Sequence, residues 1–207
     1  TLDDLTSGVR NVAIGAGAAT QVTNNTDNIA IGTDTFASSI NDGDKNIAIG
    51  SGAMRLGDIS GDGNIAVGDA SLEDLTTGTN NIAMGSGAAR EVTDNIDNIA
   101  IGHDAFAASI NDGDKNIAIG SGAIKTGDVS GDNNIGIGEL ALEDLTTGTD
   151  NIAIGSGAAL QATDNTDNIA IGHDAFAASV NDGDKNIAIG YQAMKTGDVS
   201  GADNIGI

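Results

Sequence analysis

The chain has 207 residues, and its composition excludes several classes of protein before any motif is considered. It carries 30 acidic residues against 8 Lys and Arg, a net charge of −22. This charge argues against binding to nucleic acid or to an anionic membrane surface, because both partners require basic side chains. There are 31 Gly but no Cys or Trp, and only 2% of the residues are aromatic. We therefore expect a thin aliphatic core without a disulfide framework.

One short motif recurs along the whole chain. It consists of Asn, two apolar residues separated by Ala or Gly, and a closing Gly, and it begins at Asn11, Asn28, Asn46, Asn64, Asn81, Asn98, Asn116, Asn134, Asn151, Asn168, Asn186 and Asn204. The spacings are 17, 18, 18 and 17 residues, and this series then repeats. Four coils thus form a 70-residue unit. Such self-similarity is typical of solenoid proteins.

The repeat predicts one continuous rod over residues 1–207 rather than separate domains. The units are 1–10 (partial), 11–80, 81–150 and 151–207 (partial). Because the pattern runs up to both ends, we expect the sequence to be a segment of a longer polypeptide. No apolar run approaches the ~20 residues that a membrane-spanning helix needs, so we expect no direct membrane insertion in this segment.

Each motif predicts a short β-strand. Its second and fourth residues are β-branched in nearly every coil, as in Ile47 and Ile49, and Ala separates them. This alternation indicates a strand with two different faces. We expect the second and fourth columns to point into the coil, and the Asn and the central Ala to point outward. The Gly that follows, such as Gly50, ends the strand where a Cβ would obstruct a bend.

A second apolar segment follows each strand, and we expect it to form a second strand. Its main column contains Ala19, Phe36, Met54, Leu72, Ala89, Phe106, Ile124, Leu142, Ala159, Phe176 and Met194. A further apolar residue comes at a sliding offset, at Val22, Ile40, Ile59, Leu75, Val92, Ile110 and Val129. Residues 41–45, 60–63 and 76–79 are polar turn-formers. Each coil is therefore predicted to contain a strand, a bend, a second strand and a polar loop, without a helix longer than about two turns.

A single coil cannot fold alone. Its four or so apolar side chains contribute roughly 6–12 kcal/mol when buried, whereas ordering a coil costs on the order of 20–30 kcal/mol of backbone entropy. Contacts between stacked coils must supply the difference. At ~4.8 Å per coil, we expect a parallel rod roughly 55 Å long.

The regular polar columns are interpreted as structural. The Asn column predicts a ladder of side-chain amides that bond from coil to coil. The residue before each Asn alternates in charge on neighbouring coils, which predicts cross-strand ion pairs at Asp27 and Lys45, Asp97 and Lys115, and Asp167 and Lys185.

Asp-rich loops suggest a calcium site as an alternative to simple turns. The carboxylates concerned are Asp42, Asp44, Asp112, Asp114, Asp182 and Asp184. They are hard oxygen ligands of the kind that Ca²⁺ prefers. However, the loops lack the later Glu of an EF-hand, and Asp-Gly is an ordinary turn pair. We therefore predict turns here, with no metal or cofactor site, and calcium binding remains the open alternative.

Other functional classes fit the sequence less well. His103 and His173 share a column with Thr33, which favours a surface role over catalysis, and no arrangement of Ser, His and Asp suggests a nucleophile. We therefore expect no enzymatic activity. An ice-binding solenoid would need a long Thr column, but Thr76 and Thr77 recur only at 70-residue intervals. A hexapeptide acyltransferase helix would need an apolar residue at every sixth position, whereas here the spacing slides.

The strand motif followed by x-x-Ala resembles the repeat of trimeric autotransporter adhesin head domains, and similar repeats occur in bacteriophage tail and surface fibres. The resemblance covers essentially the whole chain. It implies a left-handed parallel β-roll, three chains wound about one axis, and a role in surface attachment. The chain differs from the adhesin heads in its longer coils, and the resemblance supplies no catalytic residue.

From this resemblance we expect a structural segment of an extracellular fibre or adhesin at a cell or virion surface, with a phage tail or capsid fibre shaft as the alternative. The expected partners are two further copies of the chain and a host-surface or matrix ligand. The outward Ala column is the predicted trimer interface, because small residues allow close approach. Its members include Ala13, Ala30, Ala48, Ala66, Ala83, Ala100 and Ala118.

Overall fold

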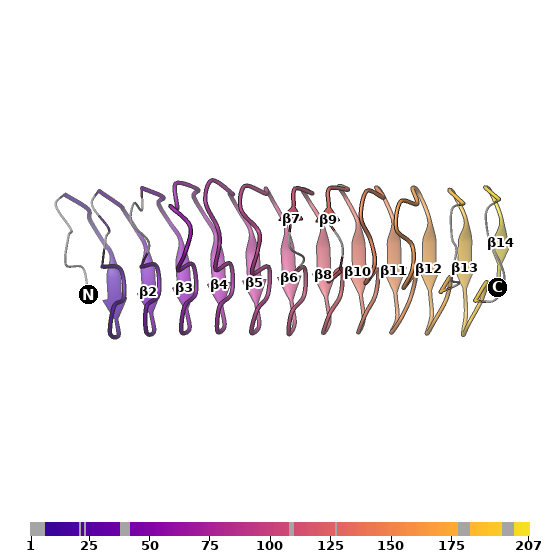
Figure 1. The fold of residues 1–207 in the computed structure, drawn as a ribbon, viewed down its shortest axis with the longest axis horizontal. Helices are drawn as coiled ribbons and strands as arrows, with labels where there is room; N and C mark the ends of the chain where they lie inside the picture. Colours follow the sequence, from indigo (N-terminus) through magenta and orange to yellow (C-terminus); the bar gives the residue numbers. More distant parts are fainter. Residues whose placement is uncertain are drawn as a thin grey trace.

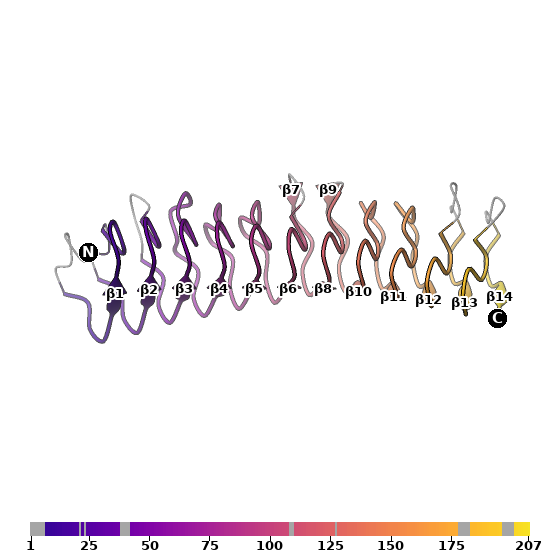
Figure 2. The ribbon, with the colours of Figure 1, turned by 90° about the horizontal axis from the view of Figure 1, so that it is seen from below.

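The protein is a straight rod of stacked coils (Figure 1). The computed structural model describes residues 7–20, 22, 24–37, 42–107, 110–126, 128–177, 183–195 and 201–207. Parallel strands lie side by side along the long axis, with the first and last coils at opposite ends, and Figure 2 shows the same stacking from below. The described residues form no helix. The prediction of an all-β parallel solenoid is confirmed.

Twelve strands form the main sheet in sequence order. They are β1 (Val12–Ile14), β2 (Ile29–Ile31), β3 (Ile47–Ile49), β4 (Ile65–Val67), β5 (Ile82–Met84), β6 (Ile99–Ile101), β8 (Ile117–Ile119), β10 (Ile135–Ile137), β11 (Ile152–Ile154), β12 (Ile169–Ile171), β13 (Ile187–Ile189) and β14 (Ile205–Gly206). Two short strands, β7 (Ile110–Asn111) and β9 (Asp128–Val129), pair in a second sheet.

The register of the main sheet follows the sequence repeat. Ile47 pairs with Ile65 and Ala48 pairs with Ala66, so identical columns lie on top of one another. The Ile47 amide donates to the Asn64 carbonyl at 2.8 Å, and main-chain bonds of this kind continue from coil to coil. The spacing of the Asn motif therefore predicted the stacking correctly.

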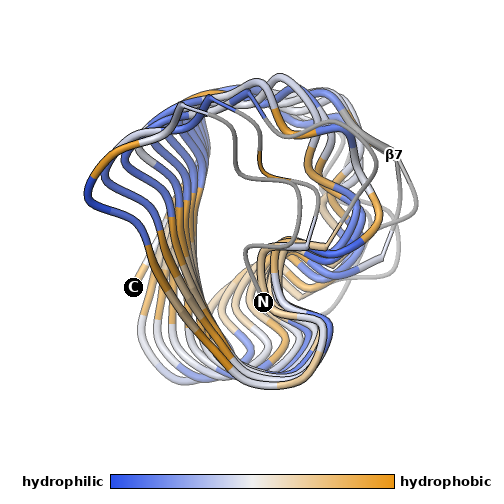
Figure 3. Ribbon diagram, turned by 90° about the vertical axis from the view of Figure 1, so that its left-hand side faces the viewer, coloured by the Kyte–Doolittle hydropathy of each residue, from blue (hydrophilic) through white to orange (hydrophobic). Residues whose placement is uncertain are grey.

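The prediction of which strand face points inward is wrong. From β2 to β13 the central residue of each main-sheet strand and the preceding Asn are buried, whereas the flanking apolar residues lie on the outer surface. Figure 3, a view along the rod, shows the strands as one wall of the coil, hydrophobic along their length. The buried central residues of the alanine column include Ala30, Ala48, Ala66, Ala83, Ala100, Ala118, Ala153, Ala170 and Ala188.

The reason for the error is that the interior is filled from the opposite side of the coil. Phe36, Met54, Leu72 and their equivalents as far as Phe176 are buried and supply its bulk, and Met194 in the last of these positions is partly buried. Little room is left for the strand. At Gly136, which replaces the usual Ala, an added Cβ would lie 3.0 Å from Ile124 Cγ1. The strand therefore presents its smallest residues inward, and the larger Ile side chains are placed outside.

The second apolar segment forms tight turns in place of the predicted second strand. Within it, alternate residues adopt a left-handed backbone conformation, as at Asp104 (φ 49°) and Phe106 (φ 51°). Such positive φ values are incompatible with a continuous strand. Only β7 and β9, within the described residues, form strands on this side of the coil. Ile40 of the predicted apolar column lies outside the described residues.

The asparagine ladder is confirmed, although it lies inside the coil and not on its surface. Asn116 Oδ1 accepts a bond from the Asn134 main-chain N–H at 2.8 Å, and Asn116 Nδ2 donates to the Gly131 carbonyl at 2.9 Å. The same main-chain bond links each ladder Asn to the next, from Asn11 to Asn204. The amides thus satisfy buried backbone groups that would otherwise lack partners.

Candidate functional site

The outer surface of the main sheet is the most distinctive exposed feature of the rod. We call it the isoleucine face and define it by the second and fourth residues of the strand motif in each coil. Ile101, Ile154 and Ile171 are 36–38% exposed, and Met84 is 43% exposed. Ile49 and Ile189 are similarly exposed, the members in the first and last coils are more exposed, and the others are partly buried. Because the columns continue from β1 to β14, the apolar surface extends along the whole rod.

Two columns of mostly exposed residues border this face. The entry border is the residue before each ladder Asn: Arg10, Asp27, Lys45, Gly63, Asn80, Asp97, Lys115, Asn133, Asp150, Asp167, Lys185 and Asp203. The exit border is the residue after each strand-ending Gly: Ala16, Thr33, Ser51, Asp69, Ser86, His103, Ser121, Glu139, Ser156, His173 and Tyr191. Figure 3 shows the hydrophilic entry border as the corner where the chain enters the strand wall.

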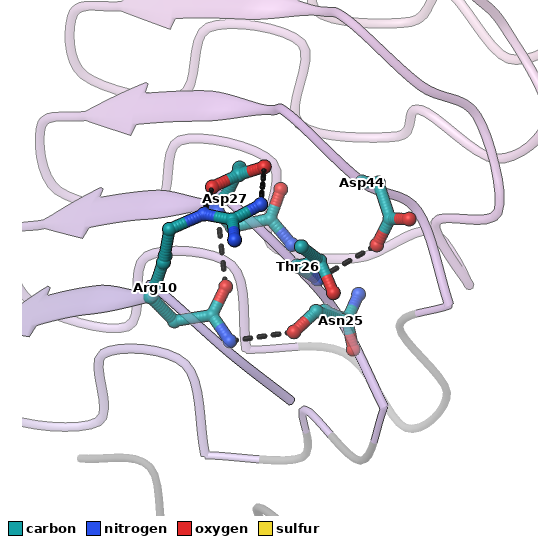
Figure 4. Close-up of polar contacts among 7 residues, drawn as sticks. Arg10, Asn25, Thr26, Asp27 and Asp44 are labelled. Atoms are coloured by element: carbon teal, nitrogen blue, oxygen red, sulfur yellow. Dashed lines mark hydrogen bonds and ion pairs between the residues drawn. The ribbon is translucent and has the colours of Figure 1, made fainter. Parts of the chain in front are cut away.

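The entry border contains an ion pair between neighbouring coils. The Arg10 guanidinium binds the Asp27 carboxylate with two hydrogen bonds, one of them 2.7 Å from Nη2 to Oδ2 (Figure 4). The hydrogen bond from Arg10 lowers the pKa of Asp27, and the charge of Lys45 lowers it further. The sequence predicted an ion pair between Asp27 and Lys45, whereas the direct partner of Asp27 in the structure is Arg10. The predicted role of this column in coil-to-coil pairing is therefore seen at Asp27 with a different partner.

The exit border contains both histidines. His103 Nδ1 lies 3.5 Å from Asp104 Oδ2, which Lys125 Nζ contacts at 3.1 Å. One unit later, His173 Nδ1 lies 3.3 Å from the carboxylate of Asp174.

A lysine and an aromatic ring complete the surroundings of His173. Lys195 Nζ contacts Asp174 at 2.6 Å, and the hydrogen bond from Lys195 lowers the pKa of Asp174. The Tyr191 ring stacks on His173 at a centroid distance of 5.4 Å. As predicted, both histidines lie on the surface, and each ring is held beside a carboxylate that a lysine already neutralises.

The Asp-rich loops use one of their carboxylates to cap the preceding coil. Asp44 Oδ1 accepts a bond from the Thr26 main-chain N–H at 2.7 Å (Figure 4), and Asp114 does the same for Ile96 at 2.7 Å. Asp184 accepts from the Thr166 N–H at 2.9 Å. This role was not predicted from the sequence, because the partner is on another coil.

Among the described residues, the other carboxylates of the calcium hypothesis belong to no cluster of metal ligands. Asp42 and Asp112 are exposed, and Asp182 lies outside the described residues. Within the part of the chain that the structure describes, no group of three or more His, Cys, Asp or Glu residues is arranged to hold a metal ion. The capping bonds account for one carboxylate per loop, so a calcium ligand is not needed to explain Asp44, Asp114 and Asp184.

The predicted alanine interface is wrong, because the Ala column lies inside the coil. The isoleucine face takes its place as the apolar surface that another molecule can cover. Among the described residues, no helix is long and apolar enough to cross a membrane. No family model, curated protein or solved structure matches the chain. The candidate function therefore rests on the geometry of this face and its borders.

Proposed function

We propose that the chain is a shaft segment of an extracellular surface fibre, which spaces attachment sites from a cell or virion surface, and that its role is structural. The observation that carries this proposal is the unbroken register of twelve parallel strands. In such a solenoid each coil contacts only its neighbours, so length increases in proportion to the number of coils. The resemblance to adhesin-head and phage-fibre repeats supports a position at the surface.

We further propose that three copies associate through the isoleucine face. Two Ile columns span a strip ~10 Å wide and ~55 Å long, about 550 Å² in flat projection. This strip lies near the upper end of the roughly 300–600 Å² that the largest apolar patch of a typical monomeric protein covers, and such patches are often functional. It also approaches the ~800 Å² per partner of a standard protein interface. The resemblance implies three chains, and a threefold axis parallel to the rod covers the face in every copy.

The spacer role is tested by changing the number of coils. Deleting residues 81–150, one full unit, should shorten the rod by ~19 Å, or four coils, without changing its cross-section. Small-angle X-ray scattering or negative-stain electron microscopy measures both dimensions. A deletion of 81–110 serves as the control, because it breaks the register and should disrupt the rod. An unchanged rod length, or a compact particle, after the 70-residue deletion would contradict the proposed spacer role.

The trimer is tested by mass. Sedimentation equilibrium should give three times the 20.4 kDa chain, about 61 kDa, at micromolar concentration. A monomer mass over the whole concentration range would contradict the proposed assembly while leaving the solenoid intact.

A further inference from the structure

On two coils, the borders of the isoleucine face carry an aspartate on one edge and a histidine on the other. In the coil of β6 the entry residue is Asp97 and the exit residue is His103. One unit later, in the coil of β12, the same positions are Asp167 and His173. Both histidines are exposed, with side-chain accessibilities of 66% and 52%. Each acid and its histidine are thus at the same height on opposite edges of one surface.

Rotational symmetry brings these edges together. In a cyclic assembly about an axis parallel to the rod, the strands lie roughly perpendicular to the axis. The strands of all copies point around the axis in the same direction, clockwise or anticlockwise. The end of a strand in one copy therefore meets the beginning of the strand in the next copy, which is a heterologous contact. A pure rotation also keeps every coil at its own height. The exit border of one chain then faces the entry border of its neighbour, coil by coil.

We propose that these borders form the seam between neighbouring copies, with His103 and His173 of one chain beside Asp97 and Asp167 of the next, so that mild acid tightens the assembly. This inference rests on the proposed trimer and adds its seam and its regulation. A shift of one copy by one coil along the rod would instead place Glu139 of one chain beside Asp150 of its neighbour. In register, no coil that carries both borders brings like charges together.

The surroundings of each histidine favour a partner on another chain. Its Nδ1 faces a carboxylate of its own chain, Asp104 or Asp174, so Nε2 lies on the opposite edge of the ring. Those carboxylates are already paired with Lys125 and Lys195. The positive charge that an imidazole gains is therefore left for an acceptor across the seam. The other groups next to His173 are Tyr191, stacked on the ring, and Gln192, which binds Asp174 at 3.4 Å.

The expected consequence is a pH-dependent association constant. Histidine gains its charge between about pH 8 and pH 5. Exposed ion pairs each strengthen binding by a factor of about two or more, and a trimer contains two pairs in each of three seams. The apparent dissociation constant should therefore fall roughly tenfold or more between pH 7.5 and pH 5.5.

Sedimentation equilibrium at the two pH values tests the seam. His103→Ser/His173→Ser introduces the residue found at Ser121 of the same border, and Asp97→Asn/Asp167→Asn introduces the residue found at Asn80. Both double variants should still form trimers at pH 7.5 but lose the tightening at pH 5.5.

Asp150→Asn is the matched control for the seam. It removes a charge from the same border on a coil whose exit residue is Ser156, and it should keep the full pH effect. If the apparent dissociation constant of the histidine variant falls at pH 5.5 as much as that of the parent, the proposed seam is wrong, but the proposed trimer is not contradicted. If the parent is a monomer at both pH values, the proposed assembly itself is wrong and the seam with it.

Discussion

The two halves of each coil contribute different things to the fold. The strand half, from the ladder Asn to the closing Gly, has nearly the same residues in every coil and is held by main-chain and Asn bonds between coils. The turn half varies in sequence and absorbs the difference between 17 and 18 residues. It nevertheless supplies the largest buried side chains, such as Phe106 and Leu142. Main-chain bonds between coils also hold the turn half, as from the Phe106 N–H to the Ala123 carbonyl. The variable half thus adds the packing volume, and the constant half adds the asparagine ladder.

This division explains the exposed isoleucines. Where the turn half fills the interior, the strand half has space only for Ala or Gly inside, and its β-branched residues must lie outside. The isoleucine face is therefore a consequence of how the coil is packed. The proposed trimer would cover the apolar stripe that this packing produces.

The strand-ending glycines should be the most sensitive positions in the strand half. Gly120 has φ +135°, and an added Cβ would lie 2.4 Å from the Gly138 carbonyl oxygen on the next coil. Gly120→Ala should lower the free energy of unfolding by about 4 kcal/mol or more, because backbone cannot move aside. Gly136→Ala is the control, since its nearest neighbour is a side chain and Ala is usual there; it should change stability by less than about 1 kcal/mol. Thermal melts followed by circular dichroism give both values, and equal effects would contradict the account.

Removing a side chain of the asparagine ladder should cause the next largest loss of stability. Asn116→Ala leaves the buried Asn134 N–H and the Gly131 carbonyl without their side-chain partners. We expect a loss of about 2–4 kcal/mol, measured by chemical denaturation. Asn133→Asp should be nearly silent, because Asn133 is exposed and Asp150 occupies the same column with a similar φ. A silent Asn116→Ala would mean that the ladder is dispensable.

Sequence spacing predicted the stacking but not the sidedness of the strand, and the reason is physical. A period of two fixes which residues share a face without saying which face is inside. The deciding information is the volume contributed by residues such as Met54, which lies eight positions after Asn46 and enters from the other side of the coil. The turn conformation was also missed, because left-handed Phe106 and Ile124 carry no local signal such as Gly or Asn.

The histidine and aspartate borders were visible in the sequence as separate columns. Their relation to one face follows only when the strand direction and the outward Ile columns are known. The capping role of Asp44 was likewise hidden, because the N–H that it accepts from is 18 residues earlier, in Thr26.

One substitution in the turn half should increase the stability of the fold. Ile124 has φ 48°, a conformation that is strained for a β-branched residue, and Met54 and Met194 occupy the equivalent positions. Ile124→Met should raise the free energy of unfolding by about 0.5–1 kcal/mol. Ile59→Met is the control, because Ile59 is equally buried without a positive φ and should not gain. A gain in the control alone would contradict the strain argument.

The smallest predicted effects concern two carboxylates of the turn half. Burial, together with Glu73 and Glu91, raises the pKa of Asp74 above its ordinary 3.8. Its charge therefore destabilises the fold at pH 7, and this penalty disappears as the pH falls below 3.8. Asp74→Asn should raise the melting temperature at pH 7 and change nothing near pH 3. Asp174→Asn should act in the opposite direction at pH 7, because the hydrogen bond from Lys195 lowers the pKa of Asp174.

The most direct test of the account is cysteine labelling at two adjacent positions of β6. The chain has no Cys, so Ala100→Cys and Ile101→Cys each give a single thiol, one on each face of the same strand. At low concentration, where the chains are separate, maleimide should label position 101 rapidly and position 100 only on unfolding. Raising the concentration should protect position 101 as copies cover the isoleucine face. Rapid labelling at position 100, or no protection at position 101 at any concentration, would contradict the account.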